Sequence, residues 1–528
     1  MSVVTNNILK PAEYGAAPRW LTDGRILALV EFAAGAAAVI VLASLGVVVI
    51  GHLTDRYHLN FATGVYAALA ARLNDGVLYP SLYDGAHYGG TRYMPLFFVL
   101  HAGLARFTGE YILSGKLIAL ALSIVLCIQL YRIVRGFGCG RGVALALASL
   151  GVVTQSGYLV ATSIRADLLA VVLQLAALQL VRGGDSAPRA AGAGVLCTLA
   201  LLAKFTAAWA PAAILIAYFV KHRRASVIFL ATWLGTLALA LVCLHLGTSG
   251  RMLDSFRAGA VQNVGVVSIL KSPIAFLARL GRGGAAEAFL IPLAILECVL
   301  AVRQRRFTIY HGGLLLSLPI LLVIFTDLGA DFNHLLDLVV LAIPLAGSLW
   351  ASLPSTDRAH VAVRAGLAVA VCWVLFMCWT AMLGNPLRDV ATAWIRHAKT
   401  GFPAKPLAGL VSDDATLLCE DPWIPVSRNQ APTIIDPYAV ACMTRTHPQL
   451  YADLVRRIED GAFDQVVLRL HGGEFDPSEE GEWEDRTLGL PVINAVRKHY
   501  EVQKQAEGYL IYTPRGRAKP VGTQRAAN

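Results

Sequence analysis

Long apolar stretches dominate the first 384 residues and predict membrane-spanning helices. About 20 apolar residues cross a bilayer as a helix, the form that pairs every backbone group within the segment. The predicted spans are Ile26–Ile50, Ser114–Leu130, Val143–Val160, Leu168–Val181, Ala190–Val220, Val227–Leu246, Ala286–Val302, Gly312–Phe325, Leu335–Leu353 and Ala365–Leu383. Because Ala190–Val220 is too long for one crossing and contains Lys204 and Pro211, we interpret it as two short spans that meet near Lys204.

One segment leaves the number of crossings open. Met94–Gly109 is only marginally long enough to cross, and a full crossing there reverses the side of every later loop. Either this segment enters the membrane and returns, or a further crossing lies between Tyr111 and Arg132. The pattern as a whole predicts a polytopic α-helical membrane protein with about 11–13 transmembrane helices.

Two parts of the chain interrupt the apolar pattern. Residues 52–93 form a polar loop rich in Tyr, Asp, His, Arg and Gly, which closes on Tyr88-Gly-Gly-Thr-Arg-Tyr93. Long loops of this kind usually carry function. From Asn385 the apolar runs shorten to strand length, which predicts a small C-terminal α/β soluble domain over residues 385–528. Strands are predicted at Ala415–Cys419, Pro432–Ile435, Gln465–Leu470 and Gly508–Tyr512, and helices at Gln449–Asp460 and Leu490–Tyr500.

Composition and charge support this organisation. With 56% hydrophobic and 15% charged residues, the chain is not an ordinary soluble globular protein. The net charge of +10 comes from short basic clusters between apolar segments, which indicates membrane topology and not nucleic-acid binding. The clusters expected in the cytoplasm are Arg132, Arg135 and Arg141; Arg182 and Arg189; Lys221, Arg223 and Arg224; Arg303, Arg305 and Arg306; and Lys10, Arg19 and Arg25 of an N-terminal tail, residues 1–25.

This topology predicts a multi-pass protein of the cell inner (plasma) membrane. The membrane domain covers residues 26–384, and the loop 52–93 and the soluble domain 385–528 lie outside the cytoplasm. The nine cysteines show no metal spacing, and only Cys419 and Cys442 fall in the soluble domain, where they either form a disulfide or stay as buried thiols. No cofactor is implied by the sequence, and a divalent metal is left open.

Charged residues expected at the outer face are the candidate site. Asp167 begins a span beside Arg165, Lys204 lies at another outer turn, and Arg92 lies in the loop. Several cations with a carboxylate suit a lipid phosphate and a hydroxyl to be deprotonated. Asp167 is equally suited to cap its helix, and Asp55 after the first span is an alternative base.

The order of these features resembles the C-type (GT-C) membrane glycosyltransferase superfamily, especially bacterial relatives of the protein mannosyltransferases and aminoarabinose transferases. The resembling pieces are Tyr66–Pro80, which ends in Ala-Arg-Leu-Asn-Asp-Gly-Val-Leu-Tyr-Pro, together with Arg165–Ala170, Leu201–Thr206 and Gly329–Leu335. The resemblance implies transfer of a sugar from a polyprenyl-phosphate donor to a lipid, glycan or protein acceptor on the outer face of the lipid bilayer.

The resemblance also implies site residues. An acidic residue of the first outer loop usually serves as base in that superfamily, but the family's spacing from Gly76 falls on Ala62, and the nearest acid upstream is Asp55. The base is therefore Asp55, Asp75 or Asp167. The phosphate and donor contacts are Arg92, Lys204 and Arg165, and the sugar or acceptor contacts are Tyr88, Tyr93, Asn333 and His334.

The alternative function is a transporter or flippase of a lipid-linked saccharide, in which the same cations bind phosphate without chemistry. Transporters are often built from internal repeats with binding sites near the middle of the membrane. The sequence has no such repeat, and its charged residues gather at one face, so the pattern favours the enzyme.

Overall fold

The computed structural model of the protein describes residues 23–55, 57–59, 61–259, 266–282, 284–326, 330–353, 358–400, 407, 410–470 and 487–516. Most of the predicted tail 1–25, with Lys10 and Arg19, lies outside the described residues, and so does Gly329.

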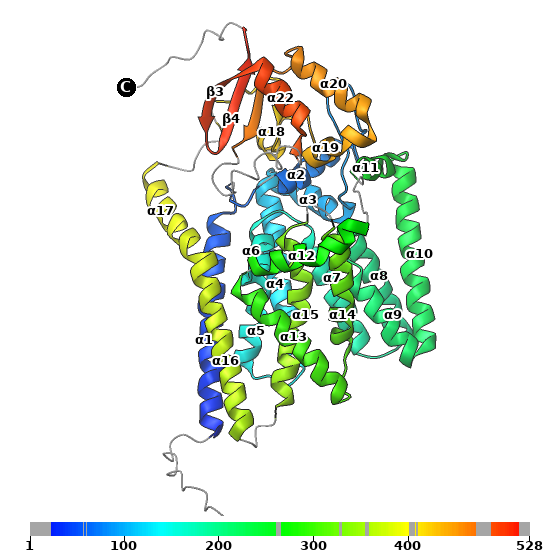
Figure 1. Ribbon diagram of the computed structural model, residues 1–528, viewed down its shortest axis with the longest axis vertical. Helices are drawn as coiled ribbons and strands as arrows, with labels where there is room; N and C mark the ends of the chain where they lie inside the picture. Colours follow the sequence, from blue (N-terminus) through cyan, green and yellow to red (C-terminus); the bar gives the residue numbers. More distant parts are fainter. Residues whose placement is uncertain are drawn as a thin grey trace, which may run out of the picture.

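A bundle of helices forms the larger part of the molecule, and the C-terminal domain lies at one end of it (Figure 1). The helices are α1 (Asp23–Gly51), α2 (Phe61–Asn74), α3 (Pro95–Thr108), α4 (Tyr111–Arg135), α5 (Arg141–Val153), α6 (Gln155–Thr162), α7 (Asp167–Arg182), α8 (Ala187–Ala203), α9 (Trp209–Lys221), α10 (Arg223–Gly247), α11 (Arg251–Gly259), α12 (Val266–Arg282), α13 (Ala285–Arg303), α14 (Ile309–Ile324), η1 (Phe332–Leu335), α15 (Leu336–Ser352), α16 (Arg358–Cys378), η2 (Trp379–Leu383) and α17 (Gly384–Thr400). Each predicted span coincides with one helix or with two consecutive helices.

The length and composition of these helices identify a multi-pass membrane protein. Within the described ranges, six helices are long and apolar enough to cross a membrane, and the bent pair of α5 and α6 makes a seventh. The six are α1, α4, α10, α13, η1 with α15, and the stretch from α16 into α17; shorter apolar helices include α8, α9 and α14.

Two predicted spans are broken, for different reasons. As expected, the stretch 190–220 divides next to Lys204, because α8 ends at Ala203 and α9 begins at Trp209. Pro211 lies in the first turn of α9, where its missing N–H costs no helical hydrogen bond. The stretch 143–160 was predicted as one span, but the chain bends by 65° at Thr154, whose side chain caps α6.

The first helix after the polar loop is not the next crossing. Helix α3 has 14 residues, packs against α2, and lies with it beneath the C-terminal domain (Figure 1). After a left-handed Gly109, α4 supplies a 25-residue apolar helix that ends in Arg132 and Arg135. By length and composition α4, and not α3, is therefore the candidate crossing, and the polar loop and this basic cluster lie at opposite ends of α4.

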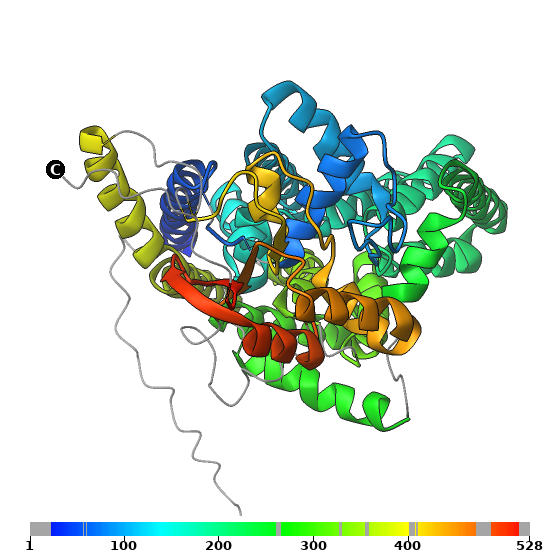
Figure 2. The ribbon, with the colours of Figure 1, turned by 90° about the horizontal axis from the view of Figure 1, so that it is seen from above.

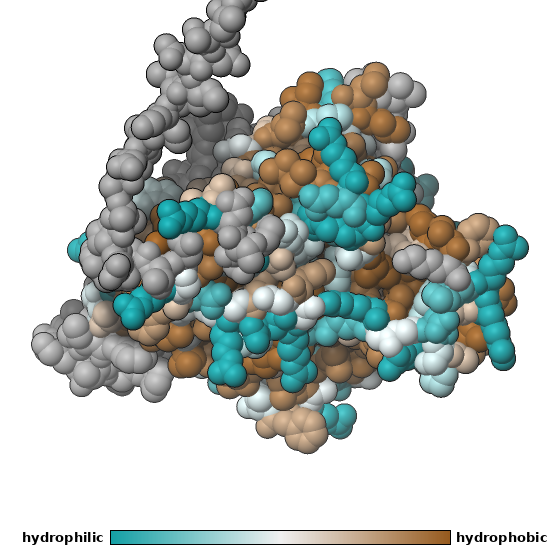
Figure 3. All heavy atoms as spheres, turned by 90° about the horizontal axis from the view of Figure 1, so that it is seen from below, coloured by the Kyte–Doolittle hydropathy of each residue, from teal (hydrophilic) through white to brown (hydrophobic). Residues whose placement is uncertain are grey.

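The two ends of the bundle differ in chemistry. We call the end beneath the C-terminal domain the domain end and the opposite end the basic end. Arg182 at the basic end donates to the Gly136 carbonyl at 2.8 Å and covers the Phe137 ring, so the predicted clusters of two loops meet. Figure 3 shows hydrophilic side chains across this face. The exposed arginines of the basic end include Arg25, Arg132, Arg135, Arg141, Arg182, Arg189, Arg223, Arg224, Arg303, Arg305 and Arg358.

The C-terminal domain is an α/β module that lies over the bundle (Figures 1 and 2). Its elements are β1 (Leu417–Cys419), α18 (Trp423–Ser427), α19 (Pro437–Thr446), α20 (Pro448–Glu459), β2 (Gln465–Arg469), α22 (Leu490–His499), β3 (Tyr500–Ala506) and β4 (Tyr509–Pro514). The strand order is β1-β2-β4-β3, with β1 parallel to β2 and the other pairs antiparallel. Core residues of this domain include Val466, Ile511 and Leu454, which are fully buried.

The domain confirms three predicted strands and both predicted helices, but its strand β3 was not predicted. Residues 432–435 are not part of the sheet; Ile434 instead pairs with Tyr88 of the polar loop. The predicted boundary after Gly384 falls inside one continuous helical stretch, α16 to α17, so the membrane helix extends further than its apolar run. Cys419 and Cys442 are free thiols, as are the other seven cysteines.

Candidate functional site

Three separate segments meet at the domain end around Asp167. Lys204, at the break between α8 and α9, places Nζ 2.6 Å from Asp167 Oδ1, and Asn333 of η1 donates Nδ2 to the same oxygen at 2.7 Å. His334 Nδ1 lies 3.3 Å from Lys204 Nζ. We call these four residues the Asp167 cluster. Four predicted site residues, separated by up to 167 positions in sequence, therefore share one hydrogen-bonded site.

The local fold explains why these side chains converge. Asp167 is the first residue of α7, so its carboxylate lies at the positive end of the helix dipole. Its partners come from other segments, so the carboxylate ties α7 to the α8–α9 break and to η1. Asp331 caps η1 by accepting the Phe332 N–H at 2.8 Å, which fixes Asn333 and His334.

A buried carboxylate beneath this cluster escaped the sequence analysis. Asp337 of α15 lies one helical turn after His334 and accepts a hydrogen bond from Trp209 Nε1 at 3.0 Å. The sequence held one signal for Asp337, its position inside a predicted span. Carboxylates inside a membrane span are rare and usually functional. The contact fixes the first residue of α9 against α15 and supports the break that carries Lys204.

A second polar cluster follows α1 and comprises His52, Asp55, Tyr57 and Lys116. The Asp55 carboxylate is hydrogen-bonded to His52 and accepts the Tyr57 N–H at 2.8 Å. Lys116 of α4 donates to the Asp55 carbonyl at 2.7 Å and lies 3.4 Å from its carboxylate. Lys116 was missed because it lies in the apolar run of α4. We call these residues the Asp55 cluster.

The two clusters differ in their access to solvent. The side chain of Asp55 is 39% exposed, whereas that of Asp167 is 7% exposed. Burial raises the pKa of Asp55, but the hydrogen bond with His52 and the charge of Lys116 outweigh it, so the pKa is lower than usual. Asp55 is therefore an accessible, ionised carboxylate.

His58 lies between the Asp55 cluster and the end of α6. Its ring stacks on Tyr57 with centroids 4.1 Å apart, and its Nδ1 lies 2.5 Å from Thr162 Oγ1 at the end of α6. Burial, followed by the positive charge of Lys116, lowers the pKa of His58 to about 4, and Arg165 acts in the same direction. The ring is therefore neutral near pH 7, and the charges of the Asp55 cluster and of Arg165 act on it.

Arg92 and Tyr93 of the polar loop lie near Arg165 and Asp167. Burial, followed by the carboxylate of Asp436, raises the pKa of Tyr93 to about 12. The charges of Arg92, Arg165 and Asp167 also act on this hydroxyl, Asp167 in the same direction and the two arginines against it. Two of the three cations predicted to bind phosphate, Arg92 and Arg165, therefore act on Tyr93, although they come from different segments.

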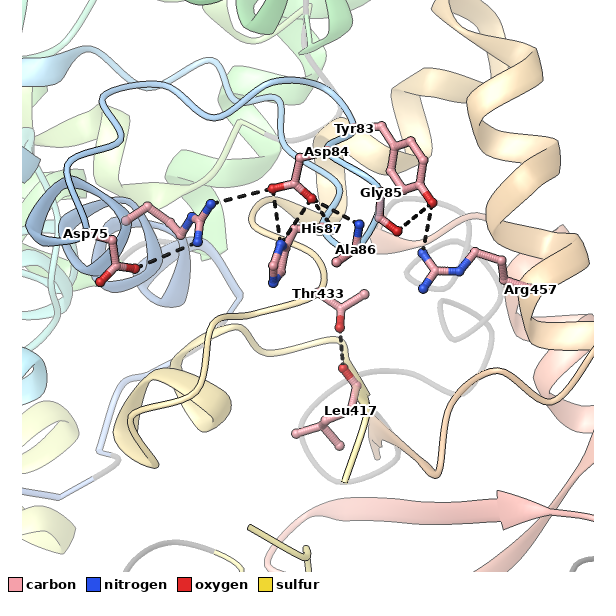
Figure 4. Close-up of polar contacts among 10 residues, drawn as sticks. Asp75, Tyr83, Asp84, Gly85, Ala86, His87, Leu417, Thr433 and Arg457 are labelled. Atoms are coloured by element: carbon pink, nitrogen blue, oxygen red, sulfur yellow. Dashed lines mark hydrogen bonds and ion pairs between the residues drawn. The ribbon is translucent and has the colours of Figure 1, made fainter. Parts of the chain in front are cut away.

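Tyr88 and Asp75 have other partners. The Tyr88 ring is buried against the C-terminal domain, and its hydroxyl donates to Asp453 at 3.1 Å. The side chain of Tyr88 therefore holds the loop to the domain, and its predicted sugar contact stays a prediction. Asp75 lies 3.8 Å from Arg72, which also lies 3.5 Å from Asp84 (Figure 4).

A metal site is a separate question. Among the residues that the structure describes, no group of three His, Cys, Asp or Glu side chains is placed to hold a metal ion. The chemistry of the two clusters is that of paired carboxylates and cations.

Comparisons with known proteins identify the fold. The sequence matches no protein-family model and no curated protein. Among solved structures, ArnT from Cupriavidus metallidurans bound to undecaprenyl phosphate aligns with a TM-score of 0.53 and 13% identity, covering 90% of this chain and 97% of that chain. ArnT in the apo state gives a TM-score of 0.51 at 14% identity, with coverage of 90% and 97%.

A second kind of membrane transferase has a similar fold. The Archaeoglobus fulgidus oligosaccharyltransferase in complex with Zn and sulfate gives a TM-score of 0.50 at 12% identity, covering 90% of this chain and 73% of that chain. The protein therefore shares its overall fold with ArnT and with this oligosaccharyltransferase, and the order of its sequence features predicted a fold of this kind.

Proposed function

We propose that the protein is an integral membrane glycosyltransferase that moves a sugar from a polyprenyl-phosphate donor to a hydroxyl acceptor on a lipid, glycan or protein. The observation that carries this proposal is the Asp167 cluster, in which a fixed ammonium, Lys204, lies at the membrane end beneath a soluble domain. Arg92 and Arg165 act at the same place. Fixed cations suit a phosphate that gains negative charge as it leaves. The similar fold of ArnT, which was crystallised with undecaprenyl phosphate, supports a donor of this class.

The reaction exchanges one carbon–oxygen bond for another. The acceptor oxygen attacks the anomeric carbon, the bond from that carbon to the phosphate oxygen breaks, and polyprenyl phosphate leaves with the bonding electrons. The proton of the acceptor hydroxyl passes to a carboxylate that acts as general base. Attack opposite to the leaving phosphate inverts the anomeric centre.

The two carboxylates take different roles. Asp55 is the base because its carboxylate is ionised and partly exposed, so an acceptor hydroxyl can reach it. Asp167 is a positioning residue, since it is buried and its oxygen holds Lys204 and Asn333. Tyr93 remains our candidate for contact with the sugar.

Topology follows from the distribution of charge. The exposed arginines of the basic end are expected in the cytoplasm by the positive-inside rule, which places both clusters and the C-terminal domain outside it. The enzyme would thus work at the outer face of the inner membrane, where a lipid-linked sugar and an envelope acceptor meet.

The test is a transfer assay with purified protein. The protein is incubated with a panel of labelled polyprenyl-phosphate sugars and an extract of membrane lipids and glycans. We expect released polyprenyl phosphate and a labelled product, both lost in Asp55→Asn and retained in Asp464→Asn, which removes a carboxylate at the surface of the C-terminal domain. Binding of donors without release across the whole panel would contradict the transferase and support a transporter of lipid-linked saccharide.

A further inference from the structure

Arg92 of the polar loop links the C-terminal domain to the candidate site. The guanidinium carbon of Arg92 lies 4.1 Å from the centre of the Tyr438 ring, at the start of α19. This is a close cation–π contact, and such contacts stabilise by roughly 0.5–2 kcal/mol according to how far they are desolvated. The ring therefore supports one face of the guanidinium from the domain side.

A buried carboxylate lies beside this contact. Asp436 is 1% exposed and caps α19 by accepting the Tyr438 and Ala439 N–H groups at 3.1 and 3.3 Å. Thr91, the neighbour of Arg92, donates its hydroxyl to Asp436 Oδ2 at 3.1 Å. Burial raises the pKa of Asp436, and the charge of Arg92 is the largest effect that opposes this rise. The carboxylate and the guanidinium therefore stabilise each other.

The rest of the loop is tied to the domain as well. Tyr88 donates its N–H to the Thr433 carbonyl at 2.7 Å and accepts the Ile435 N–H at 3.1 Å, so the loop runs as a short strand along the domain. The Arg457 guanidinium lies beside the rings of Tyr83 and Tyr88, and Figure 4 shows it near the Tyr83 hydroxyl. The loop and the domain therefore form one unit around Arg92.

The long, flexible side chain of Arg92 loses less conformational entropy on ligand binding when neighbouring residues already hold it. A free arginine loses rotamer entropy when it is fixed, and this cost otherwise falls on ligand binding. Because the Tyr438 ring already covers the guanidinium and the charge of Asp436 attracts it, Arg92 is preorganised to receive a phosphate.

We propose that Asp436 and Tyr438 are positioning residues of the C-terminal domain, which hold Arg92 in its phosphate-binding arrangement, so that docking of the domain completes the donor site. This inference rests on the proposed function. The inference gives the C-terminal domain a role in donor binding. The position of the domain over the bundle does not by itself imply such a role.

The test uses paired substitutions in the full-length protein. Tyr438→Leu removes the ring, whereas Tyr438→Phe keeps it and loses only the hydroxyl. Asp436→Asn keeps the acceptor for the helix cap and for Thr91 but removes the charge. We expect Tyr438→Leu and Asp436→Asn to weaken binding of polyprenyl phosphate and to raise the donor KM about 2- to 30-fold. Tyr438→Phe should restore both to within about 2-fold.

A double-mutant cycle separates positioning from a general loss of structure. In an Arg92→Ala background, Tyr438→Leu should have no further effect on donor binding, because the side chain it supports is gone. Wild-type affinity in Tyr438→Leu and Asp436→Asn, or full additivity with Arg92→Ala, would overturn the inference. If Tyr438→Leu does not fold, Asp436→Asn carries the test.

The binding measurement also separates this inference from the proposed function. A wild-type protein that binds polyprenyl phosphate without transferring sugar would refute the transferase, while the affinities of the variants would still decide the role of Asp436 and Tyr438. Conversely, a wild-type protein that transfers sugar, with variants that bind the donor normally, would refute only the inference.

Discussion

Replacement of Lys204 by Met should destabilise the protein because it leaves a buried carboxylate without its cation. The Lys204 ammonium lies 2.6 Å from Asp167, which at an effective dielectric constant of about 20 corresponds to a gross attraction of ~6 kcal/mol. Desolvation of both charges consumes part of this attraction. Removal of one partner of a buried pair costs about 3–5 kcal/mol, since the remaining charge stays buried. We expect that loss in Lys204→Met, although Met preserves most of the side-chain volume.

The assay is a double-mutant cycle on thermal unfolding in detergent, with wild type, Lys204→Met, Asp167→Asn and the double variant. The double variant should be more stable than the sum of the single losses predicts, with a coupling of about 1–3 kcal/mol, because it leaves no unpaired charge. Lys271→Met, the same substitution at an exposed lysine of α12, is the matched control and should be close to neutral. Additive losses within error, or a Lys204→Met variant as stable as Lys271→Met, would refute the reasoning.

The remaining predictions concern the base, the pH response and the polar loop. Asp55→Asn should lower kcat about 10²- to 10⁴-fold, the usual contribution of a general base, and leave the donor KM nearly unchanged in steady-state transfer assays. Because the folded His58 has a pKa of about 4 against an ordinary 6.5, the unfolded chain binds the extra proton first, and stability should fall by about 3 kcal/mol from pH 6.5 to pH 4. His58→Asn, which tolerates the positive φ of 54° at this position, should flatten that part of a pH-dependent melting curve. Gly89→Ala should lower both thermal stability and transfer, because a Cβ there overlaps the Ser81 carbonyl oxygen, whereas Gly103→Ala in α3 meets open space and should be neutral or stabilising.

The sequence was sufficient to locate the helices because lipid leaves the chain few choices. Apolar runs had to become helices, and the break at Lys204 was visible because a charge and a proline occur together in one run. The bend at Thr154 was not visible. There the Ser156 N–H at the start of α6 donates to Glu287 at 2.9 Å, and these residues are 131 positions apart. A contact over that distance leaves no local pattern, so periodicity cannot predict the bend.

The predicted site residues left a local signal in the sequence, whereas the missed ones depend on contacts between distant segments. Asp167, Lys204 and Asn333 were found because each lies at the end of a span, and span ends on the same side must share a membrane face. Lys116 was hidden within an apolar run, and its partner Asp55 lies 61 positions earlier. Asp436 was hidden for another reason, since nothing in a soluble α/β sequence reveals which edge docks on the membrane part.

The contrast between the two carboxylates follows from where each lysine partner lies. Lys204 and Asn333 both contact Oδ1 of Asp167, so the Asp167 carboxylate is already occupied by partners within the protein. Lys116 donates to the backbone carbonyl of Asp55 at 2.7 Å and lies 3.4 Å from its carboxylate, and the Asp55 side chain stays 39% exposed. A general base must both meet a substrate proton and pass it on to solvent, and only the second arrangement allows this. In the proposed reaction, the same ion-pair chemistry thus fixes a cation for the phosphate in one cluster and keeps an ionised base available in the other.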